Sequence, residues 1–390
     1  MIWFWWGYSV FVGVTMLVIV LMGYIGLRRV PDLTWPEWDL WPPAPHPRLS
    51  VIVPAKNEEE GIGACLGSFL EQDYDNFEVI AVNDRSTDAT PEIMEKLAAA
   101  SAGRIRVLHI ADLPSGWLGK QHAMWRAASL ATGEWLLFTD GDVMFRADAL
   151  RRAVAYAEQT RGDHLVLAPT LLAFTFGERI ITAMIQMALV GLRPWKASDP
   201  DSRAFIGWGA FNMVRRRAYE GAGTMEALRL AVVEDMELGR RIKRNGFAAR
   251  FAFGPQLVLL RWGRGMLGPV NNLTKNAYAG MGFRTWLALG AVVAILAFHI
   301  LPFFLVWFAP GWTKVGFIVE LFGIFLVYAR LERIFDINPL YFFLNPFGAG
   351  LLCYAMLRSL VVTLRQGGII WRGTKYSLAE LRAAAPKPWE

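Results

Sequence analysis

An apolar run at the N-terminus constrains the fold of this chain most strongly. Residues Ile2 to Leu27 are almost uninterrupted apolar residues, and Arg28 and Arg29 follow directly. A run of about 20 apolar residues is long enough to cross a bilayer as a helix. A cleaved signal peptide is the alternative, but the run lacks a basic segment before it and a clear cleavage site. We therefore predict a retained transmembrane anchor over residues 1–28, with its arginine end in the cytoplasm.

Composition favours a soluble domain that is joined to membrane segments. Hydrophobic residues make up 54% of the chain and charged residues 19%, which is too apolar for an ordinary soluble enzyme and too polar for a pure membrane bundle. The net charge of +6 suits either nucleic acid or an anionic lipid surface. Because membrane segments are present and no nucleic-acid-binding motif is found, we expect the membrane bilayer as a partner and no nucleic acid.

Further apolar runs predict a C-terminal membrane region over residues 284–366. The runs Trp286–Phe308 and Trp312–Leu331 are long enough to span, and Leu340–Leu364 is interrupted by Asn345 and Pro346. We expect two or three spans, of which the last either crosses or re-enters the membrane. A basic tail follows over residues 367–390. Strict alternation places this tail outside, whereas its positive charge places it inside.

The region between the membrane segments has the pattern of an α/β domain, which we predict over residues 49–283. Short apolar runs at 50–53, 77–82, 104–110 and 136–138 alternate with helical segments. This alternation predicts a mostly parallel, doubly wound sheet with helices on both faces. Residues 29–48, rich in Pro and Trp, form either a stiff linker near the membrane interface or a strap packed on the domain.

Polar residues gather where the predicted strands end. They are Asn57, Glu58, Asp84, Asp140 and Asp142. Ligands of open α/β sheets bind outside the carboxyl ends of the strands. Two carboxylates around Gly141 can hold a divalent cation, although Asp142 could instead cap a helix. A dinucleotide site is disfavoured, because the stretch from Pro54 to Gly63 lacks the glycine pattern that such a site needs.

Three motifs in this order resemble the family-2 glycosyltransferases with a GT-A fold: Val53–Glu59, Asn83–Asp88 and Thr139–Asp142. The resemblance covers roughly residues 50–283 and implies an enzyme of the hexosyltransferase class with a nucleotide-sugar donor, UDP-linked by preference. It assigns the donor site to Pro54, Ala55, Asn57, Glu58, Asp84, Asp88, Asp140 and Gly141. In that family Asp142 is the direct ligand of Mn²⁺ or Mg²⁺, and Asp140 lies nearer the ribose or sugar.

The stretch Gly116–Lys120 precedes a predicted helix, so that Lys120 either reaches a phosphate or donor sugar or is simply solvated. This stretch resembles the subgroup that acts in hopanoid, carotenoid and other lipid pathways. Arg261 and Arg264 match the Arg-x-x-Arg pattern of that subgroup, and guanidinium groups suit a diphosphate. The pattern replaces a Gln-x-x-Arg-Trp motif, which argues against a processive polymer synthase.

A second acidic pair, Glu234 and Asp235, opens a predicted helix. Asp235 could simply be a favourable partner of the helix dipole, but in the resembling family such a pair provides the catalytic base. Trp208, Gly209 and Ala210 match the place where family members line the acceptor or donor-sugar pocket, and a plain packed strand is the alternative.

These features together predict an inverting, metal-dependent glycosyltransferase. We expect a nucleotide-sugar donor, a membrane lipid hydroxyl or carboxylate as acceptor, and a multi-pass protein of the cell (inner) membrane whose catalytic domain faces the cytoplasm. Two alternatives remain open: a polyprenyl-phosphate glycosyltransferase, whose acceptor is already an anion, and a non-catalytic, nucleotide-sensing membrane protein.

Overall fold

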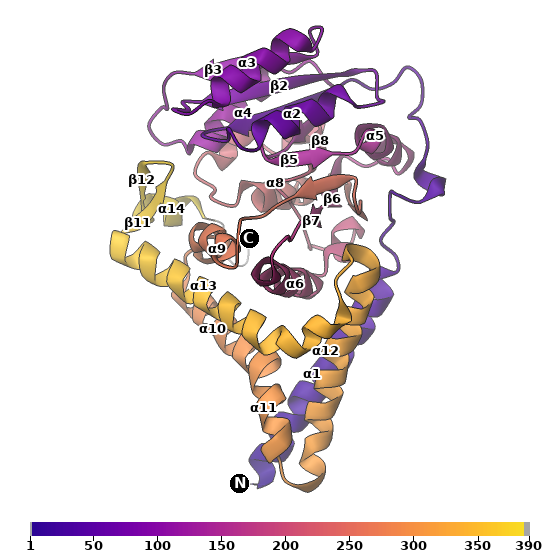
Figure 1. Cartoon of the computed structure of the whole chain (residues 1–390), viewed down its shortest axis with the longest axis vertical. Coiled ribbons are helices and arrows are strands. Elements are labelled where there is room, and N and C mark those ends of the chain that lie inside the picture. The colour runs from indigo at the N-terminus through magenta and orange to yellow at the C-terminus, as the bar shows by residue number, and fades with distance from the viewer. Residues whose placement is uncertain (1, 386–390) are drawn as a thin grey trace. The chain divides into compact units, whose positions relative to one another are not determined.

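The computed structural model describes residues 2–385 and divides into two compact units (Figure 1). The α/β unit comprises residues 30–172 and 194–261, and the membrane-helix unit comprises the described residues up to 29, 173–193 and from 262 onward. The last five residues of the predicted basic tail lie outside the described residues. Residues 173–193 and 262–283, predicted as part of the soluble domain, cluster with the membrane helices because α6 (Phe176–Gly191) and α9 (Leu267–Gly280) pack on α13 (Asn345–Gln366).

A seven-stranded sheet forms the centre of the α/β unit, in the order β3-β2-β1-β4-β8-β6-β9. The strands are β1 (Leu49–Ala55), β2 (Phe77–Asp84), β3 (Ile105–Ile110), β4 (Trp135–Phe138), β6 (His164–Ala168), β8 (Asn212–Arg215) and β9 (Ala249–Phe253). Strands β3, β2, β1 and β4 are parallel, whereas β8 is antiparallel to both β4 and β6. The sheet is therefore mixed and mostly parallel, as predicted.

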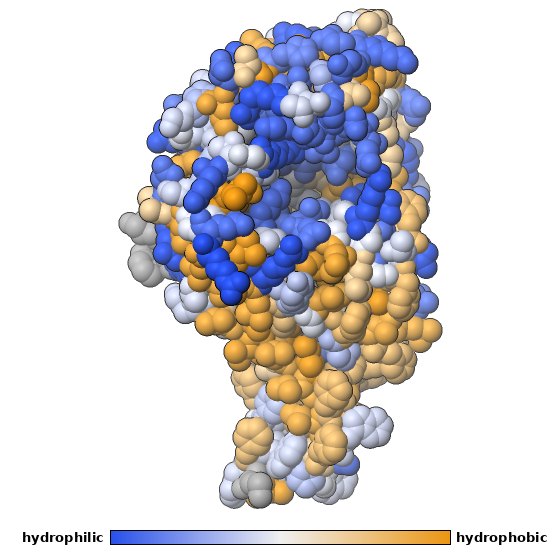
Figure 2. All heavy atoms as spheres, turned by 60° about the vertical axis from the view of Figure 1, so that its left-hand side comes forward, coloured by the Kyte–Doolittle hydropathy of each residue, from blue (hydrophilic) through white to orange (hydrophobic). Residues whose placement is uncertain are grey.

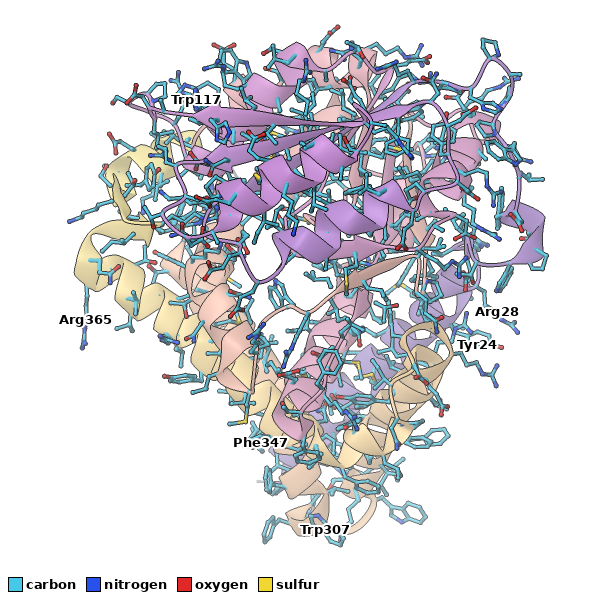
Figure 3. The ribbon with its side chains drawn as sticks, turned by 45° about the horizontal axis from the view of Figure 1, so that its top comes forward. Tyr24, Arg28, Trp117, Trp307, Phe347 and Arg365 are labelled. Atoms are coloured by element: carbon cyan, nitrogen blue, oxygen red, sulfur yellow. The ribbon has the colours of Figure 1, made fainter. Side chains whose placement is uncertain are left out.

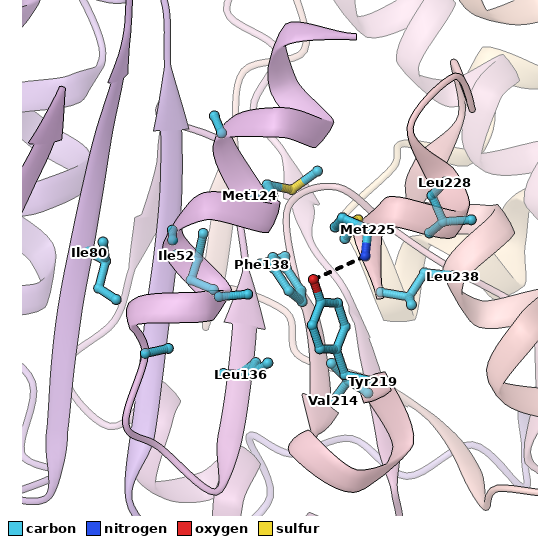
Figure 4. Packing of buried hydrophobic residues seen from close by; sticks show 14 of the residues in the cluster. Ile52, Ile80, Met124, Leu136, Phe138, Val214, Tyr219, Met225, Leu228 and Leu238 are labelled. Atoms are coloured by element: carbon cyan, nitrogen blue, oxygen red, sulfur yellow. Dashed lines mark hydrogen bonds between the residues drawn. The ribbon is translucent and has the colours of Figure 1, made fainter. Parts of the chain in front are cut away.

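Helices cover both faces of this sheet, which explains why the residues of β1 are all buried. The helices are α2 (Ile62–Leu70), α3 (Thr90–Ala100), α4 (Gly119–Leu130), α5 (Ala149–Gln159), α7 (Arg216–Gly221) and α8 (Glu234–Arg244). In one core cluster Met124 of α4 and Leu238 of α8 pack with Phe138 (Figure 4). The Tyr219 hydroxyl accepts a hydrogen bond from the Met225 backbone N–H at 3.0 Å in the same cluster. A smaller sheet of β5 (Val143–Phe145), β10 (Val258–Leu260) and β7 (Thr170–Leu171) adjoins.

The Pro/Trp-rich segment is a strap on the α/β unit. Arg151 of α5 forms an ion pair with Asp39 at 2.8 Å, and Arg152 donates to the Leu33 carbonyl at 3.0 Å. Leu33 is fully buried. Of the two alternatives for residues 29–48, packing on the domain is therefore the one that the contacts support.

The membrane-helix unit is built mainly of apolar helices. Three stretches are long and apolar enough to cross a membrane: Ile2–Leu27, Thr285–Phe308 and Pro339–Gln366. They contain α1 (Ile2–Leu27), α10 (Thr285–Ile295), α11 (Leu301–Phe308) and α13. Figure 2 shows hydrophobic side chains over this unit and hydrophilic ones over the α/β unit. Because α13 slants across its neighbours instead of running along α1 (Figure 1), the number of spans stays a prediction.

Helix α12 (Lys314–Phe335) packs along α1 through small residues. The Gly316 N–H donates to the Ser9 hydroxyl at 3.1 Å, and a Cβ on Gly13 would lie 2.9 Å from the Gly316 backbone. Small residues allow such close backbone approach between helices in lipid. The chain ends in β11 (Gly368–Trp371), β12 (Thr374–Ser377) and α14 (Leu378–Ala384).

Candidate active site

The candidate site lies where strands β1, β2 and β4 end, and the starts of α4 and α8 complete it. Lys120 lies in the first turn of α4, and Glu234 and Asp235 open α8. A small pocket among these elements is lined by Lys120, Thr139, Gly209, Asn212, Glu234, Asp235 and the apolar side chains Met124, Phe138 and Met225. Figure 4 labels these three apolar residues. The fold thus brings together predicted site residues that lie more than 100 positions apart in the sequence.

Lys120 joins the two acidic motifs. Its ammonium Nζ lies 2.6 Å from Asp140 Oδ1 and 2.6 Å from Glu234 Oε1, and its side chain is only 16% exposed. Burial opposes the charge of Lys120, but the two carboxylates outweigh it and raise the pKa of the lysine. Gln121, next along α4, donates to the Ala231 carbonyl at 2.6 Å and so ties α4 to the start of α8. Lys120 is therefore a largely buried, ion-paired cation and not a solvated side chain.

Asp235 lies beside this ion pair, and the pKa of its carboxyl group is raised. Burial and the charge of Glu234 raise the pKa of Asp235 to about 6, and Lys120 partly offsets this rise. Its Oδ1 accepts the N–H of Met236 at 2.8 Å. A carboxylate with a pKa near neutral pH is suited to general base catalysis.

A buried polar pair behind Asp235 holds its backbone. Asn212 Nδ2 donates to the Asp235 carbonyl at 3.2 Å, and Asn212 Oδ1 lies 2.5 Å from His164 Nε2. Burial lowers the pKa of His164 to about 4, so the ring is neutral at pH 7. Since an amide oxygen only accepts, the proton of this neutral ring must lie on Nε2.

The stretch Gly207–Ala210 precedes β8 as a loop that contacts both acidic motifs. A packed strand was the alternative for this region, and the strand begins only at Asn212. Thr139 Oγ1 donates to the Ala210 carbonyl at 2.8 Å. A Cβ on Gly209 would lie 2.8 Å from Asp140 Oδ2, and one on Gly207 would overlap the Asp235 carbonyl. Trp208 lies half-buried between these glycines. The loop can approach the site this closely only because it carries glycine at both positions.

The turn Asp140–Gly141–Asp142 packs on the end of β1. A Cβ on Gly141 would meet Ala55 at 3.3 Å. Asp142 is accessible to solvent, yet partial desolvation and the negative charges of Asp140 and Glu58 raise its pKa to about 7. Three carboxylates thus act on one another here, and one of them, Asp140, is paired with Lys120.

The carboxylates at this turn fit a divalent cation that takes its other ligands from outside the protein. Carboxylate oxygens suit Mg²⁺ or Mn²⁺, and Mg²⁺ commonly binds one or two carboxylates together with substrate phosphates. Among residues 2–385, no group of three or more His, Cys, Asp or Glu side chains is arranged to hold a metal alone. Asp142 and Asp140 therefore fit a metal that also needs oxygens from a diphosphate.

The two loops expected to hold the nucleotide are bonded to each other. Asn57, at φ 56°, accepts the Thr87 N–H at 2.9 Å, and Asp88 accepts the Glu59 N–H at 3.2 Å. Asn57 and Asp88 therefore fix the loop shape. Asp84 is buried at the end of β2, where Arg85 Nε pairs with it at 2.8 Å.

The structure assigns the two predicted diphosphate arginines to different units. Arg261 is the last residue of the α/β unit, whereas Arg264 belongs to the membrane-helix unit. There Glu178, buried on α6, accepts the Gly265 N–H at 2.6 Å and so holds the loop that carries Arg264. The joint action of the two arginines at a diphosphate stays a prediction.

Three polar residues of the site were not identified from the sequence: Gln121, His164 and Asn212. Asn212 offered a signal, because it interrupts an apolar run, and a buried amide needs hydrogen-bond partners. His164 and Gln121 offered none, since either could equally be exposed.

The chain is similar in sequence and in fold to known glycosyltransferases. The glycosyl transferase family 2 profile matches residues 50–220. The 4,4'-diaponeurosporenoate glycosyltransferases of two Staphylococcus aureus strains are 23% and 24% identical over 343 residues, covering 86% of this chain and 90% of each relative. The mannosyltransferase PcManGT from Pyrobaculum calidifontis, solved with GDP-Man and Mn²⁺, superposes with a TM-score of 0.52 at 18% identity. The match covers 91% of this chain and 99% of that one, and it is a likeness of fold.

Proposed function

We propose that the chain is a family 2 glycosyltransferase, as the matching profile and the GT-A-like fold support, and that it transfers a sugar from a nucleotide-sugar to a membrane lipid. A UDP-linked sugar is the donor that we propose, and a lipid hydroxyl or carboxylate is the acceptor. The lipid acceptor is supported by the relatives named for 4,4'-diaponeurosporenoate, a carotenoid-type acid, and by the apolar helices of this chain.

One observation carries this proposal: Lys120 pairs with Asp140 and Glu234 while Asp235, with a pKa of about 6, lies beside them. Asp235 takes the proton from an acceptor hydroxyl as its oxygen attacks the anomeric carbon of the sugar. A single displacement inverts the configuration at that carbon. A carboxylate acceptor would attack without losing a proton.

Residues at the ends of β1, β2 and β4 bind the donor in this proposal. Asp84 and the Pro54–Glu58 loop hold the nucleoside, and Lys120 and Arg261 add positive charge toward the diphosphate. Asp142, with Asp140, would hold Mn²⁺ or Mg²⁺, which supplies positive charge to the leaving diphosphate when bound. Asp235 lies in another element, so that holding the leaving group and removing the proton are separate tasks.

We place the enzyme in the cell (inner) membrane as a multi-pass protein. Arg28 and Arg29 directly follow the apolar helix α1 and favour a cytoplasmic position for that end. The chain enters the α/β unit at Val30. This connection supports a catalytic domain in the cytoplasm, the compartment in which nucleotide-sugars are available.

Incubation of the purified full chain with several nucleotide-sugars and total membrane lipid tests the proposal. We expect the mass of one lipid class to increase by one sugar residue, with release of an equal amount of nucleoside diphosphate. The sugar in the product should have the anomeric configuration opposite to that in the donor, and the reaction should stop when EDTA removes divalent cations. Binding of UDP without any lipid product would favour the nucleotide-sensing alternative.

A further inference from the structure

Four arginines gather where α1 and α12 end. Arg28 and Arg29 follow α1, and Arg330 and Arg333 lie in the last turns of α12. The two helices run parallel, because Gly13 lies against Gly316 and a Cβ on Gly323 would lie 3.2 Å from Val20. This register brings the C-terminal ends of both helices to the same level.

Within residues 2–385, none of these four arginines forms an ion pair with a carboxylate. Of the ionisable groups that act on Arg330, Arg333 and Arg28 are positive and oppose its charge, whereas Tyr24 favours it. Arg330 is half-buried, and its Nε is enclosed without a hydrogen-bond partner among the described residues. The Arg28 guanidinium lies 4.4 Å from the centre of the Tyr24 ring, which fixes it beside the helix (Figure 3).

The two buried arginines among the described residues, Arg151 and Arg152, are both paired with carboxylates. Arg151 binds Asp39 and Asp73, each at 2.8 Å, and Arg152 binds Asp148 at 2.5 Å. Like charges held together in a partly desolvated place are unfavourable unless an anion offsets them. The arginine cluster therefore has the electrostatics of an anion site.

The position of the arginine cluster indicates which kind of anion it binds. The 26 apolar residues of α1 end directly before Arg28, so that the arginines lie at the level of the lipid headgroups. Exposed aromatic residues mark the other end of the same helices: Trp3 on α1, and Trp307 and Trp312 around the start of α12. Aromatic side chains favour a membrane interface, and hence both ends of the helix pair match the two interfaces of a bilayer.

We propose that Arg28, Arg330 and Arg333 bind the phosphodiester of an anionic phospholipid. The planar guanidinium groups donate paired hydrogen bonds to phosphate oxygens, and the acyl chains lie along the apolar faces of α1 and α12. Basic clusters at the cytoplasmic ends of membrane helices recognise anionic lipid in this way. The site is separate from sugar transfer and does not depend on the proposed function.

Titration of the full chain in neutral detergent micelles, with bound lipids counted by native mass spectrometry, tests this site. The probes are phosphatidylglycerol and phosphatidylcholine. R330Q and R333Q should each weaken phosphatidylglycerol binding about fivefold, because a basic residue near an anionic surface contributes about 1 kcal/mol. R365Q, the matched control at the exposed end of α13 (Figure 3), removes the same charge and should leave binding unchanged.

Three results would overturn the proposal. Equal weakening by R365Q would mean that general charge attracts the lipid. Equal binding of phosphatidylcholine would mean that the anionic headgroup is not recognised. Displacement of the lipid by millimolar inorganic phosphate would identify a free-anion site instead of a lipid site. Arg333 and Arg28 are exposed, so R333Q and R28Q carry the test if R330Q does not fold.

Discussion

At the scale of single residues, Asp235 is the side chain whose role is easiest to isolate. Asp235→Asn preserves its size and removes its basicity, so transfer to a lipid hydroxyl should fall about 10²- to 10⁴-fold in kcat. Donor binding, measured by titration of UDP, should change little. Glu220→Gln, on the exposed side of α7, removes a carboxylate charge away from the pocket and should leave kcat unchanged.

Full activity of the Asp235→Asn variant would be equally informative. An acceptor that is already an anion needs no base, so undiminished transfer would remove Asp235 as the base. It would favour a lipid carboxylate or a polyprenyl phosphate as the acceptor.

The raised pKa of Asp235 predicts how the rate depends on pH. A base acts in its deprotonated form, and with a pKa of about 6 this form predominates above pH 6. Below that pH, kcat/KM should fall about tenfold for each pH unit. A profile from pH 5 to pH 8, measured with a hydroxyl acceptor, checks this. A flat profile down to pH 5 contradicts the assignment.

A substitution of Lys120 gives a second test that Asp235 is the group whose titration sets the pH profile. Its positive charge lowers the pKa of Asp235 against burial and Glu234, so Lys120→Met should move the acidic limb of the profile to higher pH. An unchanged limb in an active Lys120→Met variant would show that the titrating group is not Asp235.

The sequence predicted where the candidate residues lie in the fold better than it predicted their surroundings. Asp140, Asp142, Lys120 and Asp235 follow motifs with local signals, because a strand end or a helix start fixes their place. The bond of Lys120 to both Asp140 and Glu234 could not be predicted, since it depends on how α4, β4 and α8 meet. The same holds for the support that His164 gives to Asp235 through Asn212.

At the scale of elements, the loop before β8 and the start of α8 form one packed contact. A Cβ on Gly207 would overlap the Asp235 carbonyl, so Gly207→Ala must shift either the loop or the helix that carries the base. A displacement of about 1 Å can cost 10²-fold in rate, and we expect a loss of this size in kcat.

The control for Gly207→Ala is Gly67→Ala in α2. A Cβ on Gly67 meets no atom within 4 Å, so this variant should keep full activity and gain about 0.5–1 kcal/mol in the free energy of unfolding. Comparison of kcat and thermal unfolding for both variants separates loss of site geometry from loss of stability. Normal kcat in Gly207→Ala would mean that the loop does not position Asp235.

Element prediction succeeded where chain neighbours determine the structure. The strands and helices from β1 to β4 alternate with short connections, and their parallel arrangement followed from that pattern. For the stretch Gly207–Val214 the pattern left open a pocket lining and a packed strand, and it did not show where a strand would begin. Only Asn212–Arg215 pairs with β4 and β6, whereas the preceding glycines leave the sheet to reach Asp140 and Asp235, a long-range contact without a local signal.

At the scale of the whole molecule, α1 and α12 predict the orientation of the chain in the membrane. Helix α12 has 22 residues, about 33 Å of helix, which matches a hydrocarbon core of about 30 Å. Glu320 of this helix is fully buried. Helix α12 is not among the three apolar spans, because it carries several charged residues, Glu320 and Arg330 among them. Because α12 lies parallel to α1, both helices should begin outside and end in the cytoplasm.

Cysteine labelling tests this orientation, since both native cysteines, Cys65 and Cys353, are buried. Trp312→Cys, at a position that is 80% exposed before α12, should react with a membrane-impermeant maleimide in intact cells. Glu332→Cys, exposed near the end of the same helix, should react only after permeabilisation. The reverse pattern would place the arginine cluster outside, where nucleotide-sugars are absent. Labelling of both positions from one side would mean that α12 does not cross the membrane.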